Sequence, residues 1–224
     1  MIKKEPINYL EDFAAITRFP SPFLPQNLTN EEKINLIAEK FKGIMEVLGL
    51  DLNDDSLART PYRVAKMYVE EVFSGIDTSN FPRMSFIEDK YQHNQRSSMV
   101  FVKTPFCSFC EHHFVPMNGV VSAAYVPNGK LIGLSKIPRI IHFFSKRPQV
   151  QERLSAQIAD ALSLVLDTES VAVSITAQHY CMIARGIEKD SSHAVTNLLR
   201  GEFDSNEALR NEFFDAIIRE KGMK

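Results

Sequence analysis

The sequence predicts an α+β protein, and three observations lead to this expectation. Apolar residues recur at helical spacing in the first third of the chain, and runs rich in β-branched and aromatic residues follow. Helical spacing then returns between two pairs of these runs. The expected order is two helices, then β-β-α-α-β-β, then one helix, and antiparallel strands around a helix pair are typical of α+β folds. A chain of 224 residues, 44% of them hydrophobic, is long enough to bury a sizeable core.

The first part of the chain predicts an arm followed by two helices. Residues 1–28 contain four prolines and show no sustained periodicity, so we expect an arm. The first helix is expected to begin at Thr29, because Glu32 stands three residues later in a capping-box arrangement, and to end at Gly49. A second helix is expected from Thr60 to Gly75.

The rest of the chain predicts a four-stranded antiparallel sheet, two helices that cover one of its faces and a C-terminal helix. We expect strands at 99–106, 119–126, 171–177 and 180–187, and helices at 135–145, 150–165 and 206–222. The expected organisation is an arm (1–28), a helical N-terminal region (29–95) and a catalytic domain (96–224). Such a sheet has exposed edges, and pairing with another copy covers them, so we expect a homo-oligomer.

Composition excludes several classes of function. The chain has 26 Lys and Arg against 28 Asp and Glu, without a basic stripe, so we expect no nucleic-acid partner. No apolar run approaches the roughly 18 residues of a membrane helix, and the N-terminus lacks the apolar segment of a secretory signal. Three cysteines are too few for a disulfide framework. These features predict a cytoplasmic protein with reduced thiols and no membrane partner.

A metal site is predicted by two clusters of cysteine and histidine. Thiolate and imidazole are ligands that zinc prefers, and a catalytic zinc keeps three protein ligands and one open position. In the expected sheet, both clusters lie at strand starts that can come together. The six candidate ligands are Cys107, Cys110, His112, His113, His179 and Cys181.

Local spacing refines this prediction but leaves alternatives open. In a strand, residues i and i+2 face the same side, so His179 and Cys181 are expected to point into one space. His112 and His113 are adjacent, and in an extended chain they point apart, so we expect only one of them to bind a given ion. Each residue taken alone is also compatible with an ordinary core position. A redox pair with the C-x-x-C spacing at 107–110 is less favoured, because the flanking pattern is not βαβ.

Two helix starts predict a site for an anion and a planar base. Ser135, Lys136 and Arg139 stand at one start, where backbone N–H groups and cations bind anions. Gln151 and Glu152 stand at the next, where a carboxylate can accept two hydrogen bonds from a heterocycle. For each group, a solvated helix face is the alternative.

Five segments together resemble the zinc-dependent GTP cyclohydrolase I family. The resemblance covers roughly residues 30–220, and the matching segments are RTPYRVAKMYVEEVFSGID, CEHHF, GLSKIPRI, RPQVQERL and HYCMIARGI. It implies the tunnelling fold and a toroidal homodecamer with active sites at subunit boundaries. It also implies conversion of GTP and water to formate and 7,8-dihydroneopterin triphosphate. A non-catalytic zinc scaffold with the same fold is the alternative, but it would have no need of the substrate-binding residues.

The same resemblance implies roles for individual residues. By motif, the zinc ligands are Cys110, His113 and Cys181, and the proton-transfer residues are His112 and His179. The residues implied to contact GTP comprise a guanine pair and a set of triphosphate contacts, one of them from a neighbouring subunit: Gln151 and Glu152, then Ser135, Lys136, Arg139, Arg185 and the neighbour's Arg63.

Overall fold

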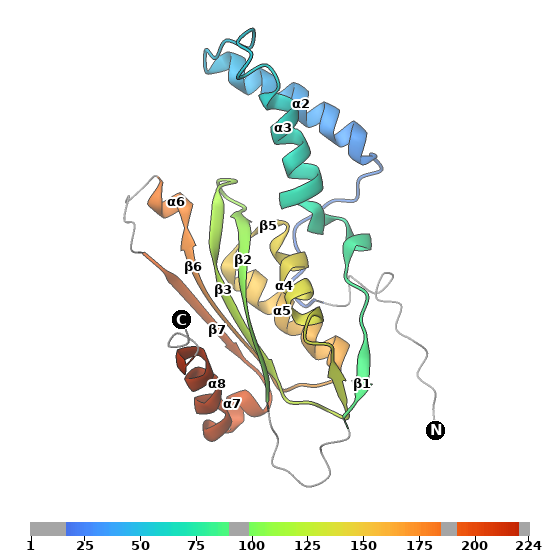
Figure 1. The fold of residues 1–224 in the computed structure, drawn as a ribbon, viewed down its shortest axis with the longest axis vertical. Helices are drawn as coiled ribbons and strands as arrows, with labels where there is room; N and C mark the ends of the chain where they lie inside the picture. Colours follow the sequence, from blue (N-terminus) through green and yellow to red (C-terminus); the bar gives the residue numbers. More distant parts are fainter. Residues whose placement is uncertain (1–16, 90–98, 185–191, 220–224) are drawn as a thin grey trace.

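A computed structural model describes residues 17–89, 99–184 and 192–219, and it shows a mixed α+β architecture (Figure 1). The main sheet has five strands in the order β5-β2-β3-β6-β7. Four of them are long and pair antiparallel, and β5 adds a short parallel pairing to β2. The strands are β2 (Val100–Cys110), β3 (Pro116–Tyr125), β5 (Pro148–Gln149), β6 (Val171–His179) and β7 (Ala194–Leu199).

Helices cover both faces of this sheet, but the helices on one face cover only its lower end (Figure 1). On one face, α4 (Lys136–Ser145) and α5 (Gln151–Leu166) enclose the main core, where Phe144, Leu162 and Ile175 are fully buried. Burial of each such side chain contributes about 1.5–3 kcal/mol. On the other face, α7 (Glu202–Ser205) and α8 (Glu207–Arg219) close a smaller core over the lower end of the sheet. No helix in the described part of the chain could span a bilayer.

A helical pair extends beyond the upper end of the sheet (Figure 1). Helix α2 (Asn30–Val47) has the predicted capping box, in which Thr29 and Glu32 bond to each other's backbone. Helix α3 (Thr60–Lys66) continues without interruption into a π-helix, η1 (Met67–Val72). Two short 3₁₀ turns follow, η2 (Ser74–Ile76) and η3 (Thr78–Asn80). A two-stranded sheet pairs β1 (Phe86–Glu88) with β4 (Lys130–Ile132).

The predicted fourth strand at 180–187 is wrong. The chain leaves β6 at His179 and forms one helical turn, α6 (Tyr180–Ile183), and the strand that pairs with β6 is β7. Residues 185–187 lie outside the described part of the chain. The apolar residues after His179 form a short run, and such a run does not distinguish strand from helix by its period.

The chain upstream of α2 is bound to α5 by buried polar groups. Asp160 on α5 accepts hydrogen bonds from the Thr17 hydroxyl (3.0 Å) and from the Arg200 guanidinium (2.6 Å). Gln157, one turn earlier, donates to the carbonyl of Phe19 at 2.9 Å. Because an unpartnered buried polar group is costly, these contacts offset the burial of a carboxylate and an amide in α5.

Gly75 joins the helical pair to the main core at a very close backbone approach. Its N–H donates to the Lys146 carbonyl at 2.7 Å, and its carbonyl accepts from the buried Arg147 guanidinium at 2.5 Å. A Cβ at this position would lie 2.1 Å from the carbonyl oxygen of Phe143. Burial lowers the pKa of Arg147 to about 10, so this junction also shields a guanidinium among aromatic rings.

We expect Gly75→Ala to lower the free energy of unfolding by about 1–3 kcal/mol, because the added methyl group would overlap rigid backbone. Gly43→Ala is the matched control. Gly43 lies inside α2 with no atom within 4 Å of the added Cβ, so alanine there is expected to stabilise the chain by about 0.5–1 kcal/mol. Urea unfolding at one fixed protein concentration compares the variants. Equal stability of the two would contradict the close approach.

Candidate metal and substrate site

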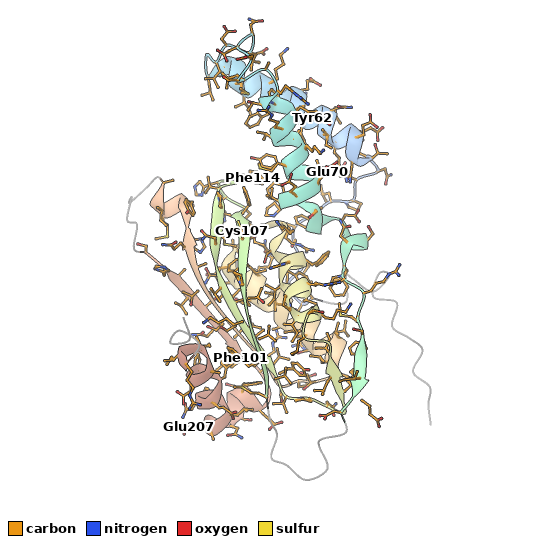
Figure 2. All side chains as sticks on the ribbon, in the orientation of Figure 1. Tyr62, Glu70, Phe101, Cys107, Phe114 and Glu207 are labelled. Carbon is orange, nitrogen blue, oxygen red and sulfur yellow. The ribbon has the colours of Figure 1, made fainter. Side chains whose placement is uncertain are left out.

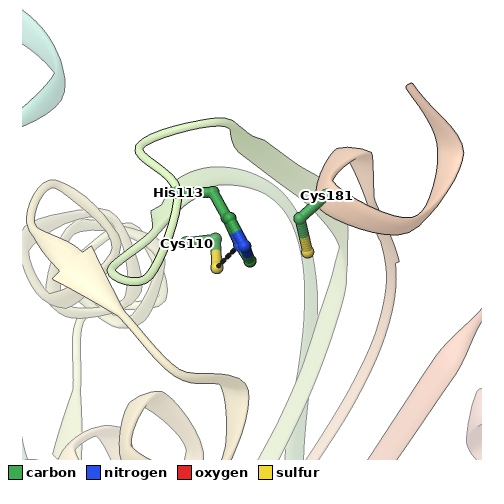
Figure 3. A group of neighbouring side chains, drawn as sticks. All are labelled: Cys110, His113 and Cys181. Atoms are coloured by element: carbon green, nitrogen blue, oxygen red, sulfur yellow. Dashed lines mark hydrogen bonds between the residues drawn. The ribbon is translucent and has the colours of Figure 1, made fainter. Parts of the chain in front are cut away.

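Three predicted ligands converge at the upper end of the main sheet. The ligand atoms of Cys110, His113 and Cys181 all lie within 4.8 Å of one another (Figure 3). Cys110 is the buried last residue of β2, and Cys181 lies in α6. Two sulfur atoms and one nitrogen form a donor set that suits zinc and leaves a fourth position for another ligand. The three residues therefore form a candidate metal-binding group.

The turn between β2 and β3 presents the two adjacent histidines. The Cys110 carbonyl accepts from the N–H groups of His113 (3.4 Å) and Phe114 (2.9 Å), and the Cys110 N–H donates to Val115 (2.9 Å). Phe114 takes a left-handed conformation with φ 50°. This conformation costs a non-glycine residue roughly 1–2 kcal/mol, so other contacts must hold it.

The turn also corrects the reasoning applied to the two histidines. They do not alternate as in an extended chain, because the chain folds back at 111–113. The Nδ1 atoms of His112 and His113 both lie 3.8 Å from the Cys110 sulfur. His113 belongs to the group that includes Cys181, whereas the His112 side chain is 65% exposed. Only His113 belongs to the group, as expected, although the reason given for it, an extended chain, was wrong.

An ion pair ties the same turn to α5. Arg153 binds Glu111 through two hydrogen bonds, of 2.5 and 3.2 Å, and both side chains are about four-fifths buried. The Glu111 N–H also donates to the Gln149 carbonyl at 3.0 Å. The sequence gives no signal for this pair, because its members stand 42 positions apart in different elements.

His179 lies at the end of β6, where Gln151 holds it. Its Nε2 lies 2.8 Å from the Gln151 Oε1, and the Gln151 amide donates to the carbonyls of Ile175 (3.1 Å) and Ala194 (3.2 Å). Burial lowers the pKa of His179, and the nearby Glu152 carboxylate partly opposes this. Burial therefore favours the neutral imidazole, and the buried Gln151 side chain is already engaged with protein groups.

Glu152 differs from its neighbour Gln151. It lies in the first turn of α5 and is exposed. Its carboxylate makes no hydrogen bond or ion pair with any residue that the structure describes. It is therefore available to accept hydrogen bonds from a ligand.

The predicted anion-binding residues lie away from the metal-binding group within one chain. Ser135 and Lys136 are at the start of α4, and the end of α4 leads to Gln149, which pairs with Cys110. Helix α4 has 10 residues and is roughly 15 Å long. The exposed Arg139 lies one turn into α4, and Arg63 is exposed on α3. Arg185 lies outside the described residues.

The fold and the group of ligands define the chain as an α+β protein with a metalloenzyme-type centre, in which two thiols and an imidazole are accompanied by a half-buried histidine two residues before Cys181. The sequence model of GTP cyclohydrolase I matches residues 37–218. The chain belongs to the GTP cyclohydrolase I family, whose members are hydrolases that act on cyclic amidine C–N bonds.

Curated relatives named GTP cyclohydrolase 1 match most of the chain. The protein of Vibrio campbellii is 48% identical over 198 residues, covering 88% of this chain and 90% of the relative. That of Serratia proteamaculans is 48% identical over 203 residues, covering 90% of each. One solved structure, an archaeosine synthase described as QueF-Like in the apo form, aligns with a TM-score of 0.38 at 17% identity. It covers 46% of this chain and 95% of the other.

We expect Cys110→Ser and Cys181→Ser to lose bound zinc, because a hydroxyl is a much poorer zinc ligand than a thiolate. Zinc content per chain is measured by mass spectrometry after reconstitution and gel filtration. Cys107→Ser is the matched control, since Cys107 is exposed and not a member of the group. Retention of zinc by both ligand variants, or equal loss from the control, would contradict the assignment.

Proposed function

We propose that the chain converts GTP and water to 7,8-dihydroneopterin triphosphate and formate. Membership of the family supports this reaction. The observation that carries it is the convergence of Cys110, His113 and Cys181 beside His179, from segments far apart in sequence. We further propose that the four long strands and their two covering helices form the tunnelling fold.

Zinc is the metal that we assign to the group. Its donor set of two thiolates and an imidazole fits, and bound zinc supplies Lewis acidity that makes hydroxide available near neutral pH. Cys110, His113 and Cys181 hold the ion, while His112 and His179 hold and move protons. C8 of guanine is a poor electrophile until N7 is protonated, so a histidine that donates to N7 promotes the addition of water at C8.

The later steps of the proposed reaction also need proton transfer. After water adds at C8, the imidazole ring opens, and a second hydrolysis releases C8 as formate. Rearrangement of the ribose and closure of the new ring then move several protons. The exposed His112 and the half-buried His179 offer two groups of different solvent access for these steps.

Recognition of GTP is proposed to combine a carboxylate with several cations. Glu152, exposed and without a partner among the described residues, accepts from N1–H and the 2-amino group of guanine, which adenine lacks. Gln151 precedes Glu152 in the chain and is also proposed to contact the guanine base. In this structure its side-chain oxygen lies within hydrogen-bond distance of His179. The proposed triphosphate contacts are Ser135, Lys136, Arg139 and Arg185, together with Arg63 from a neighbouring subunit.

The proposed site needs more than one copy of the chain. In one chain the start of α4 lies at the far end of the helix from the segment that pairs with Cys110, so we propose that the cations which meet the triphosphate come from another copy. A second copy that brings its own α4 start to the group completes the site. This supports a homo-oligomer with shared active sites, which we propose is a toroidal decamer.

Product formation is the direct test of the reaction. Purified protein is incubated with GTP, and formate and oxidised-neopterin fluorescence are measured with and without a chelator. Formation of both products, and their loss on chelation, are expected. Formate without the fluorescent product, or full activity in the metal-free protein, would contradict the proposal.

We expect Glu152→Ala to lower kcat/KM for GTP by roughly 10- to 100-fold, because hydrogen bonds to a charged acceptor contribute about 1.5–3 kcal/mol. The fold should persist, since Glu152 is exposed. Glu212→Ala, at an exposed position of α8, is the control and should retain normal turnover. Wild-type turnover of the Glu152 variant would refute the guanine assignment.

Co-expression tests the shared site. We expect Cys181→Ser and Lys136→Ala chains to be inactive alone and to regain activity in mixed oligomers, because some sites would combine an intact metal-binding group with an intact α4 start. Mixing Cys181→Ser with Cys110→Ser is the control and should restore nothing, since both defects affect one group. Two inactive parents whose mixture stays inactive would argue against sharing.

A further inference from the structure

Four aromatic rings link the helical pair to the turn that carries His112 and His113. Phe73 lies 5.5 Å from Phe114 and 5.6 Å from Phe109 between ring centroids, and Tyr68 lies 5.1 Å from Phe73 and 6.3 Å from Phe114. We call these four residues the aromatic clasp. Figure 2 shows Phe114 at the upper end of the sheet, close below α3.

The π-helix η1 explains how two residues of one segment reach the same turn. Tyr68 and Phe73 are five positions apart, and in an α-helix such residues point roughly 140° away from each other. Here the Phe73 N–H donates to the Tyr68 carbonyl at 3.0 Å, an i to i+5 bond. This widening brings both rings to one side, and π-helical segments are frequent at functional sites.

Burial in the core does not account for the left-handed backbone conformation of Phe114. Phe114 is 50% exposed, yet it holds a left-handed φ of 50°, which is a genuine outlier for a bulky residue. The residue directly before it is the ligand His113. A change in the Phe114 conformation would therefore move the His113 imidazole relative to Cys110 and Cys181.

We propose that Phe114 is a positioning residue, and that the aromatic clasp fixes its left-handed conformation and thereby the place of His113 in the metal-binding group. The proposal rests on the metal site proposed above. Residues that orient a ligand in this way tune metal affinity, and their loss typically costs 10- to 100-fold. The clasp also connects η1, and through it α3, to the site.

Binding of Co²⁺ to the metal-free protein tests the clasp without any measurement of activity. Thiolate and imidazole ligands give bound Co²⁺ a visible and near-ultraviolet spectrum that reports ligand geometry. We expect Phe114→Leu and Phe73→Leu to weaken Co²⁺ binding by about 10-fold or more and to alter this spectrum. Phe114→Tyr keeps the ring and should bind as the wild type does.

Two further variants separate positioning from general destabilisation. Phe101→Leu removes a ring that packs 6.0 Å from Phe213, near the lower end of β2 (Figure 2), and should lower the melting temperature while Co²⁺ binding stays normal. Phe114→Gly relieves the backbone strain but removes the ring, and should still weaken binding. If Phe73→Leu does not fold, Tyr68→Leu at the edge of the clasp replaces it.

The outcomes distinguish failure of the aromatic clasp from failure of the proposed metal site. A wild-type protein whose Co²⁺ spectrum shows no thiolate ligation would overturn the metal site, and the clasp with it. A normal wild-type spectrum with unchanged affinity in Phe114→Leu and in the Phe73 or Tyr68 variant would overturn the clasp alone. Equal weakening in Phe101→Leu would also overturn it.

Discussion

The pairing of β3 with β2 on one side and β6 on the other is the constraint on which the site depends. Its register places Phe109 opposite Pro116 and Met117 opposite His179. Two segments far apart in sequence therefore end at the same height of the sheet. A slip of one residue would turn every side chain of a strand to the opposite face and would separate the thiols. The strands also bury apolar side chains in the main core, and a slipped register would expose them.

Helix α5 connects the separate parts of the molecule through polar side chains within an apolar surface. Gln151 holds a site histidine, Arg153 holds the turn before β3, and Asp160 holds the chain upstream of α2. Each of these groups is at least partly desolvated, so each requires a partner. One rigid element thus aligns the site, the sheet and the arm.

Much of this arrangement was predictable from the sequence, and the failures have physical reasons. The capping box at Thr29 and the helical period before Gly49 are local signals, and both predicted α2. The strand predicted after His179 failed because a short apolar run fits either secondary structure. Clustering of cysteine and histidine indicated a metal-binding group. The clasp was not predicted, because its partners meet only in the folded chain.

The attachment of the upstream chain to α5 has a practical consequence for shortened forms of the protein. Among the described residues, the bonds from the upstream chain to Asp160 and Gln157 begin at Thr17. A cut a few residues further in, past Phe19, would remove the Thr17 partner of buried Asp160 and the Phe19 partner of buried Gln157, and would leave the Asp160 carboxylate with Arg200 alone to offset its burial. A crystallisation fragment or a fusion junction at this end is therefore best designed to retain Thr17 and all that follows it.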